Sequence, residues 1–419
     1  MSLIIEKLND DTTFLFAFAP SFAPKDTKTG RKFPGAFTIL MDPWLGGPST
    51  ILHPSFQVAS HTGSAVIKSL TELDPPPDVI VISQDKPDHC HEPTLCSLPK
   101  DTKTRILATP GAAKTIKSWK YFEYDIVHIM RPYHPTKAGV LTKIRLEPYT
   151  SNSSPGEITI ANIPTRRDLT GLHNAIGITY RPPGSLLSTF GDDTISLSDL
   201  ARAPNKKHEL RKSQSAANVS KSTPKPTATR ERSDSAPRPI YLDPLGKTQP
   251  PLPTHTTTTT TTTLPFSELK RVDSKISQKT RRHREKTLSI IYTPHGLNMH
   301  TLNDYTTHHL HRISAYPLTA LFHCWNTEEN PWILGGKVAN GAPSGVEVAA
   351  AMEAKHWIST HDEIKDLKGF ATIWLRSRRY CHEEVIGMLW EAESRKDRKR
   401  RDKTSLKVMD VGERFRIEG

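Results

Sequence analysis

The chain has 419 residues with a formal net charge of +13, of which only 35% are hydrophobic while 34 are prolines. This is little apolar material for a chain that folds throughout, so part of it is expected to remain unfolded. Its four cysteines are scattered, which argues against a disulfide framework and for a reducing compartment. The apolar run at residues 14–20 is too short for a signal peptide or a membrane span. We therefore expect an intracellular, cytoplasmic protein away from membranes, or a nuclear one if its basic segments act as targeting signals.

The positive charge is concentrated in two segments. Residues 182–286 carry 19 Lys and Arg against 10 Asp and Glu, and residues 395–403 carry seven against two. The rest of the chain has 31 basic and 32 acidic residues and is close to neutral. Aromatic residues that could stack on bases do not alternate with the basic ones, so targeting or solubility is expected of these segments and specific nucleic-acid binding is not.

Residues 1–181 are expected to form the first half of a folded domain. Short apolar, β-branched runs separated by turn residues predict strands, and apolar residues at helical spacing predict a few helices between them. Such an order is typical of a mixed sheet layered by helices. The predicted strands are Leu3–Leu8, Thr12–Phe18, Phe37–Met41, Val79–Ile82, Arg105–Ala108, Asp125–Met130, Leu141–Leu146, Ile158–Ile163 and Ala175–Tyr180, and the predicted helices are Ser64–Leu73 and Ala112–Trp119.

Residues 182–286 interrupt this domain. They are rich in Ser, Thr, Pro, Lys and Arg and contain eight consecutive threonines, so they are predicted to be a disordered insert that cannot bury enough apolar surface to fold. Residues 287–419 are predicted to supply the second half of the domain. The expected strands there are Leu288–Tyr292, Leu318–Phe322, His356–Ser359 and Leu406–Val411, and the expected helices are Val346–Ala354 and Thr372–Trp390.

The stretch from Val79 to Glu92 combines a buried strand with polar, metal-capable side chains at its end. Similar strand ends recur along the chain, each bearing an Asp or a His. They are, in order, Asp42-Pro43-Trp44-Leu45, Asp88-His89, His173, His295-Gly296 and His361. In this order the chain resembles the metallo-β-lactamase superfamily, in particular the branch of ascorbate-6-phosphate lactonase-like proteins. The resemblance covers residues 1–181 and 287–419, and it implies an α/β fold, a four-layer αββα sandwich with a metal site at one edge.

The first metal position of that family is altered here. The resemblance places Gln84, Lys86 and His173 where the family has three histidines. A charged lysine has no lone pair, and an amide oxygen is a weak partner for zinc. We therefore expect the first metal to be absent, with His173 as a weak ligand or simply a hydrogen-bonding residue.

The second metal position is better preserved. The resemblance assigns it to Asp88, His89, His295 and His361, with His295 at the place of a bridging aspartate. These residues predict one divalent metal, zinc first and manganese or iron as alternatives, in a tetrahedral or five-coordinate site. Each also has a plain structural interpretation, since Asp88-His89 and His295 suit turns and His361 suits a helix start.

Two functions follow from this reading. The first is a mononuclear metal-dependent hydrolase that acts on an ester, lactone or phosphoester of an unknown small molecule, with Lys86 and Asp88 as catalytic residues. The second is a catalytically inactive metallo-β-lactamase-like scaffold that binds a ligand or a protein. Metal content distinguishes the two.

Overall fold

The computed structural model describes residues 1–21, 23, 33, 35–149, 151–166, 168, 170–185, 287–396 and 403–419, and these residues belong to one folded unit. Residues 186–286, which make up nearly all of the predicted insert, lie outside the described residues. So do residues 397–402 of the basic segment 395–403. The disorder of the insert and the boundaries drawn around it therefore stay predictions.

Two seven-stranded sheets form the centre of the described unit. Each sheet contains a run of parallel strands flanked by antiparallel ones. The first sheet has the order β20 (Arg414–Glu418), β1 (Ser2–Lys7), β2 (Phe14–Ala19), β3 (Phe37–Met41), β6 (Val79–Ile82), β7 (Arg105–Ala108) and β8 (Val127–Ile129). The second has the order β19 (Ser405–Lys407), β16 (His356–Ser359), β13 (Ala320–His323), β12 (Leu288–Thr293), β11 (Asn174–Arg181), β10 (Gly156–Pro164) and β9 (Leu141–Leu146).

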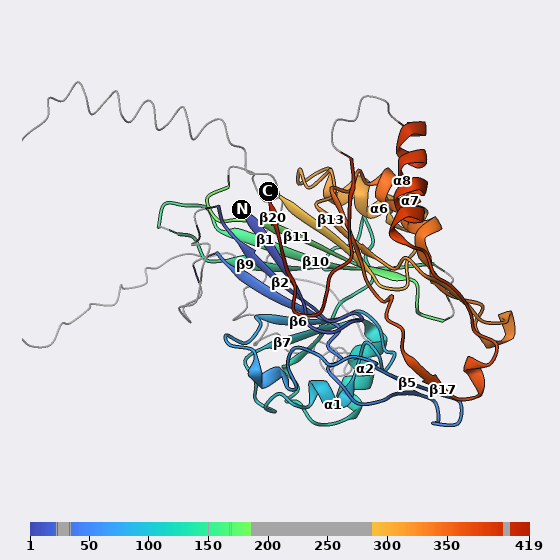
Figure 1. Ribbon diagram of the computed structural model, residues 1–419. Helices are drawn as coiled ribbons and strands as arrows, with labels where there is room; N and C mark the ends of the chain where they lie inside the picture. Colours follow the sequence, from blue (N-terminus) through green and yellow to red (C-terminus); the bar gives the residue numbers. More distant parts are fainter. Residues whose placement is uncertain are drawn as a thin grey trace, which may run out of the picture. The chain divides into compact units, whose positions relative to one another are not determined.

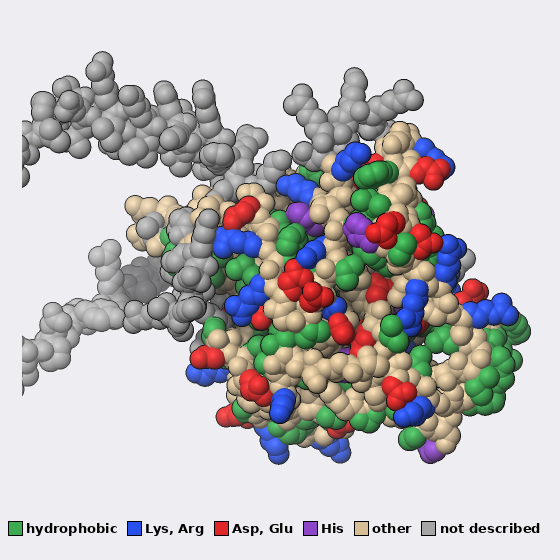
Figure 2. Space-filling model, in the orientation of Figure 1, with side chains coloured by type: hydrophobic (Ala, Val, Ile, Leu, Met, Phe, Trp, Pro, Cys, Tyr) green, Lys and Arg blue, Asp and Glu red, His purple; other side chains and the backbone are tan. Residues whose placement is uncertain are grey.

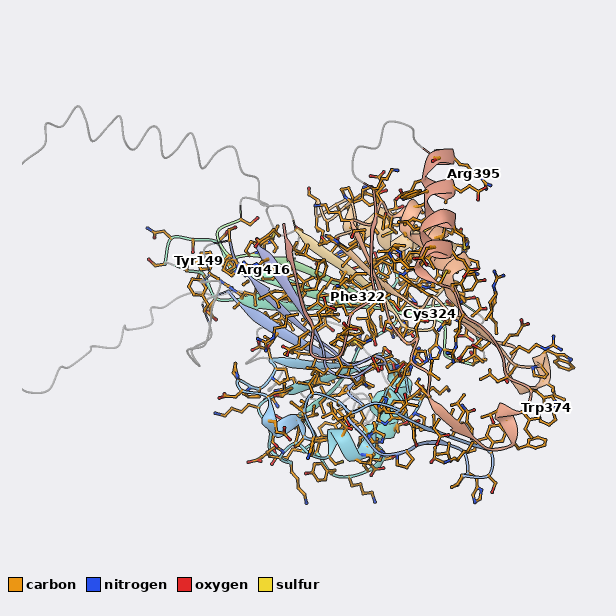
Figure 3. All side chains as sticks on the ribbon, viewed as in Figure 1. Tyr149, Phe322, Cys324, Trp374, Arg395 and Arg416 are labelled. Carbon is orange, nitrogen blue, oxygen red and sulfur yellow. The ribbon has the colours of Figure 1, made fainter. Side chains whose placement is uncertain are left out.

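The two sheets pack face to face around one hydrophobic core. Side chains of both sheets meet there, as when the rings of Phe16 and Phe322 approach to 4.9 Å between centroids. Figure 3 labels Phe322 in the middle of this sandwich. Strands β6 and β12 are buried along their whole length, because their outer faces are covered as well.

Helices cover the outer face of each sheet. On the first sheet lie α1 (Glu92–Leu95) and α2 (Pro110–Ser118), and on the second lie α6 (Met299–Tyr305), α7 (Gly341–Ala351) and α8 (His382–Lys396). Figure 1 shows the first pair below the strands and the other three above them. The four layers are therefore helix, sheet, sheet and helix, which confirms the predicted αββα sandwich.

Two small three-stranded sheets extend from the sandwich. One has the order β15 (Lys337–Asn340), β14 (Thr327–Glu329) and β18 (Arg376–Arg378), and the other has the order β17 (Asp366–Lys368), β5 (Gln57–Ser60) and β4 (Ser49–Ile51). The remaining short helices are η1 (Leu70–Glu72), η2 (Thr306–Leu310), which directly follows α6, η3 (Trp332–Leu334) and η4 (Phe370–Thr372).

One predicted helix is wrong and another begins later than predicted. Residues 64–69 form no helix, because Ala65 and Ile67 pack against the cluster under the first sheet while Val66 is exposed, and only η1 is helical. The helix expected from Thr372 begins only at His382, since the residues before it form β18 and pair with β14. In both segments, pairing and packing with distant residues outweigh local helical spacing.

The surface in Figure 2 mixes acidic and basic side chains, with hydrophobic ones gathered at its right-hand edge. Trp374 projects at this edge in Figure 3, and Phe370 and Ile373 beside it are also exposed. Among the described residues, no helix combines the length and the apolar character that a membrane crossing requires.

Candidate metal centre

The predicted ligands follow parallel strands whose carboxyl ends share one edge of the sandwich. Asp88 and His89 lie in the turn after β6, His295 follows β12, and His361 follows β16. Ligands and catalytic groups gather at such edges because the loops there converge. One ligand atom from each of the four residues lies within 4.8 Å of the others.

The three imidazoles are held so that each presents Nε2 to the common centre. His89 Nδ1 lies 2.9 Å from Asp42 Oδ2, His295 Nδ1 lies 3.0 Å from the Val338 carbonyl, and His361 Nδ1 lies 2.8 Å from Asp11 Oδ1. Each acceptor requires a hydrogen on Nδ1, which leaves Nε2 with a lone pair in the neutral ring. Metal-binding histidines are commonly oriented in this way by a carboxylate or a carbonyl.

The atoms at the centre suit a cation. Nε2 of His89 and Nε2 of His295 lie 3.1 Å apart, where two lone pairs repel unless a proton or a metal lies between them. Two nitrogens that bind one zinc at about 2.1 Å in tetrahedral geometry would lie about 3.4 Å apart. Asp88 Oδ1 is buried and has no hydrogen-bond partner within the described part of the chain. The donor set of three imidazoles and one carboxylate therefore fits one divalent metal.

The charges around the centre favour one positive charge there. Burial, together with the neighbouring His361 and His89, holds the pKa of His295 well below its usual value, so this ring is neutral. For Asp88, burial alone would raise the pKa, but His89, Lys365 and His361 together lower it. Burial would likewise lower the pKa of His89, but the carboxylates of Asp88 and Asp42 outweigh it and raise the pKa. A cation at the centre would replace the proton that these carboxylates favour on His89.

Asp42 supports His89 from behind. This fully buried carboxylate accepts hydrogen bonds from the Ser83 amide at 2.7 Å, the Ser83 hydroxyl at 2.5 Å and the Tyr292 hydroxyl at 2.9 Å. With His89 it makes four contacts that fix both oxygens. The sequence marked Asp42 only as part of Asp42-Pro43-Trp44-Leu45, and its partners explain why an aspartate ends this strand.

Asp11 and Lys365 form a second supporting pair that sequence reasoning missed. Asp11 is buried in the turn between β1 and β2 and lies 2.8 Å from Lys365 Nζ as well as from His361. Burial would raise the pKa of Asp11, yet His361 and Lys365 hold it well below its usual value. In sequence Asp11 is one of two acidic residues in a hairpin turn, which carries no signal of its contact with His361, 350 residues away.

Lys365 places an ammonium against two of the predicted ligands. Its Nζ lies 3.8 Å from Asp88 Oδ2 and 5.4 Å from the centre of the Trp44 ring. It also lies 3.3 Å from His361 Nδ1, but that nitrogen's hydrogen points to Asp11, so this contact is not a hydrogen bond. Burial would lower the pKa of Lys365, but Asp11 and Asp88 raise it, so the side chain stays charged.

The residues at the altered first metal position lie elsewhere. Gln84 donates to the Leu172 carbonyl at 2.7 Å, and both ring nitrogens of His173 lie 3.0 Å from backbone carbonyls. Lys86, 30% exposed at its side chain, contacts Asp85 at 3.2 Å. Among the described residues, the cluster of potential ligands includes none of these three positions.

A small pocket of about 260 Å³ opens beside this altered position. Its walls include Gln84, His173 and Asp85, together with Ser83, which donates to Asp42. The pocket therefore adjoins the supporting residues of the candidate centre, and its volume lies just below the range of about 300–1,000 Å³ that is typical of small-molecule sites.

Comparisons with known proteins show no family to which the chain belongs. No family model matches it, and no curated protein matches it. Among solved structures it is similar to Igni18, a novel metallo hydrolase from Ignicoccus hospitalis, with 10% identity, full coverage of both chains and a TM-score of 0.41. It is similar to the isothiocyanate hydrolase from Delia radicum gut bacteria at 10% identity, 98% coverage of each chain and a TM-score of 0.43. It is also similar to the metallo-beta-lactamase fold protein YhfI from Bacillus subtilis at 8% identity, with 99% and 100% coverage and a TM-score of 0.39. At identities and TM-scores this low, the activities of these proteins cannot be transferred to this chain.

Proposed function

We propose that the chain is a mononuclear metal-dependent hydrolase of a small ester, lactone or phosphoester. The observation that carries this proposal is the arrangement of three imidazoles, each held at Nδ1, around a buried Asp88 oxygen that lacks a partner within the described residues. The substrate classes follow from the resemblance to the ascorbate-6-phosphate lactonase-like branch, which stays a prediction. Zinc is the metal we expect first, because imidazoles dominate the donor set.

The residues of the chain divide the work as follows. A divalent metal held by Asp88, His89, His295 and His361 would polarise a substrate carbonyl or phosphoryl oxygen and lower the pKa of a water molecule. Asp42 and Asp11 keep two of the imidazoles in the tautomer and orientation that binding requires. The fixed charge of Lys365 offsets the two buried carboxylates beside it.

We place the substrate in the pocket over Gln84 and His173, where the family has its first metal. Lys86 is not among the residues that line this pocket, but its partner Asp85 is, and we propose that Lys86 assists from beside the pocket by stabilising negative charge on the substrate. In this proposal Lys86 and Asp88 are the catalytic residues, Asp88 as a metal ligand, and Lys365 has a supporting role.

Metal content tests the proposal. Purified full-length protein should contain about one equivalent of a divalent metal by elemental analysis, and His361→Ala should lose most of it, because one of four ligands is gone. His173→Asn is the matched control and should retain the metal, since both nitrogens of His173 contact backbone carbonyls.

Activity gives the second readout. Hydrolysis of p-nitrophenyl acetate, a simple lactone and bis-p-nitrophenyl phosphate should depend on added metal and fail in His361→Ala. Protein that takes up no metal, or that unfolds identically with and without added zinc, would favour the inactive scaffold instead.

A further inference from the structure

A second cavity lies at the opposite end of the strands from the candidate metal centre. It measures about 490 Å³ and lies between the outer face of β9, β10 and β11 and the turn η2. Its lining includes Lys143, Glu157, Thr179, Arg181, His309 and Arg312. Thr287 precedes β12 and His295 follows it, so about eight residues of mostly extended chain, roughly 25 Å, separate the two sites.

The lining of this cavity is strongly cationic. It includes four Lys and Arg residues and three histidines, but only one carboxylate, that of Glu157. The formal charge is therefore +3 with the histidines neutral. A cavity with low-dielectric walls and one sign of charge concentrates anions.

Arg181 forms the inner part of this site. The residue is only 7% exposed, although it carries a charge that cannot be neutralised at physiological pH. Its cross-strand neighbour is Glu157, but the described residues provide no hydrogen bond or ion pair to its guanidinium. Burial lowers the pKa of Arg181 and Glu157 raises it in part. A buried guanidinium whose donors find no partner among the described residues calls for an anionic one.

The sheet register directs Arg181 into the cavity. The hydroxyl of Thr159 bonds both the Thr179 hydroxyl, at 2.6 Å, and His309 Nε2, at 3.0 Å, so Thr179 faces η2. Arg181 is two residues further along β11 and therefore lies on the same face. On β9, Lys143 lies opposite Thr159, so Lys143, Thr159 and Thr179 are neighbours across the three strands and share this face.

We propose that this cavity binds a small organic phosphate. The fork of Arg181 suits two phosphate oxygens, and Lys143, two strands away on β9, provides a further charge in the same lining. The walls formed by Tyr133, Leu141 and Ile313 would hold an apolar or aromatic body, and the volume is in the range of small-molecule sites. The site is independent of the candidate metal centre and of the hydrolase proposed there.

Phenylphosphonate is the probe for this proposal, because it carries both features and has no ester bond to hydrolyse. Calorimetric titration of the full-length protein should show one site for it, weaker binding of inorganic phosphate and none of benzyl alcohol. Arg181→Gln should weaken phenylphosphonate binding about tenfold or more, the effect expected when a charge-assisted pair is removed. The matched control is Arg145→Gln, which changes an exposed arginine that lies opposite Glu157 on β9 and does not line the cavity.

Two further variants keep the test decisive. If Arg181→Gln fails to fold, Lys143→Met should weaken binding several-fold, because it removes a partly exposed cation of the same lining. His361→Ala should bind phenylphosphonate as the wild type does, which separates this cavity from the metal centre. The proposal would be overturned if millimolar phenylphosphonate did not bind. It would also be overturned if Arg181→Gln and Lys143→Met bound phenylphosphonate as tightly as the wild type does, or if His361→Ala did not bind it.

Discussion

At the residue scale, two lysines illustrate how burial decides the role of a charge. Lys86 is adjacent in sequence to the metal-like motif, but its side chain is 30% exposed and its partner Asp85 is 42% exposed. Lys365 is far away in sequence, but its ammonium is enclosed by Asp11, Asp88 and the Trp44 ring. An exposed pair contributes little to stability, whereas removal of one partner from a buried set leaves a charge without compensation.

We therefore expect Lys365→Met to lower the free energy of unfolding by about 3–5 kcal/mol, because Asp11 and Asp88 lose their nearest ammonium. Lys86→Met should change it by no more than about 0.5 kcal/mol. Urea unfolding of both variants, each without added metal, measures the difference. Equal losses would contradict the assignment of Lys365 as the structural cation.

The Lys86→Met variant also tests whether Lys86 takes part in catalysis. Lys86→Met should slow hydrolysis at unchanged stability if Lys86 assists the reaction, by about a hundredfold or more for a stabiliser of developing charge. A rate equal to that of the wild type would remove Lys86 from the proposed mechanism and leave its exposed pair with Asp85 as its only role.

At the element scale, α7 covers the second sheet with a face of small residues. Gly345 lies so close to β16 that a Cβ atom there would overlap the indole ring of Trp357, which is fully buried. Gly387 is also in the interior of a helix, but a Cβ atom there would meet nothing within 4 Å. Close packing against Trp357 therefore explains the glycine at position 345 in α7, whereas no such contact explains the glycine at position 387 in α8.

Gly345→Ala should destabilise the protein by about 1–3 kcal/mol, since overpacking outweighs the better helix propensity of alanine. Gly387→Ala should stabilise it by about 0.5–1 kcal/mol. Thermal unfolding of both variants gives the comparison. A gain in stability for both would show that Trp357 can move aside.

The turn η2 introduces a pH dependence through His309. This ring is buried against Thr159, and burial, aided by Lys143, lowers its pKa to about 4. In the unfolded chain its pKa is about 6.5. The folded state thus favours the neutral ring, so stability is complete above about pH 6.5 and is lost as the pH falls toward 4.

The contribution of His309 should reach at most about 3 kcal/mol by pH 4. His309→Gln cannot titrate there, so its unfolding free energy should fall less than that of the wild type between pH 7 and pH 5. Urea unfolding at both pH values measures this difference. Parallel pH profiles for the two proteins would contradict the assignment.

At the scale of the whole molecule, the long insert joins two neighbouring strands. Strands β11 and β12 are antiparallel, and Tyr180 lies opposite Leu288. The described chain on the two sides of residues 186–286 thus enters and leaves the sandwich at adjacent points. A short connection can span such neighbours, as in an ordinary β-hairpin.

Replacing residues 186–286 by a short Gly-Ser linker should shift the melting temperature by no more than about 2 °C if the segment is disordered as predicted. Differential scanning calorimetry of the full chain and the shortened chain tests this. A drop of about 10 °C would show that the segment stabilises the sandwich and would overturn the predicted domain organisation.

The sequence predicted the layers of the fold and the four clustered residues, but not their supports. Buried β-branched runs such as Val79–Ile82 identify strands locally, and a polar residue at each strand end is visible in the sequence. The roles of Asp11 and Lys365 depend on contacts with residues hundreds of positions away, which no local pattern encodes. Whether Ser64–Leu73 is helical was likewise decided by its packing against the first sheet.

The distance along the chain between the clustered residues determines when, during synthesis, they can come together. Nε2 of His89 and Nε2 of His295 meet although 206 residues separate them, and His361 comes later still. During synthesis these residues can meet only after the chain has left the ribosome as far as His361, which includes strands β12, β13 and β16 of the second sheet. A metal bound by all four residues would therefore mark a chain in which both sheets have already come together.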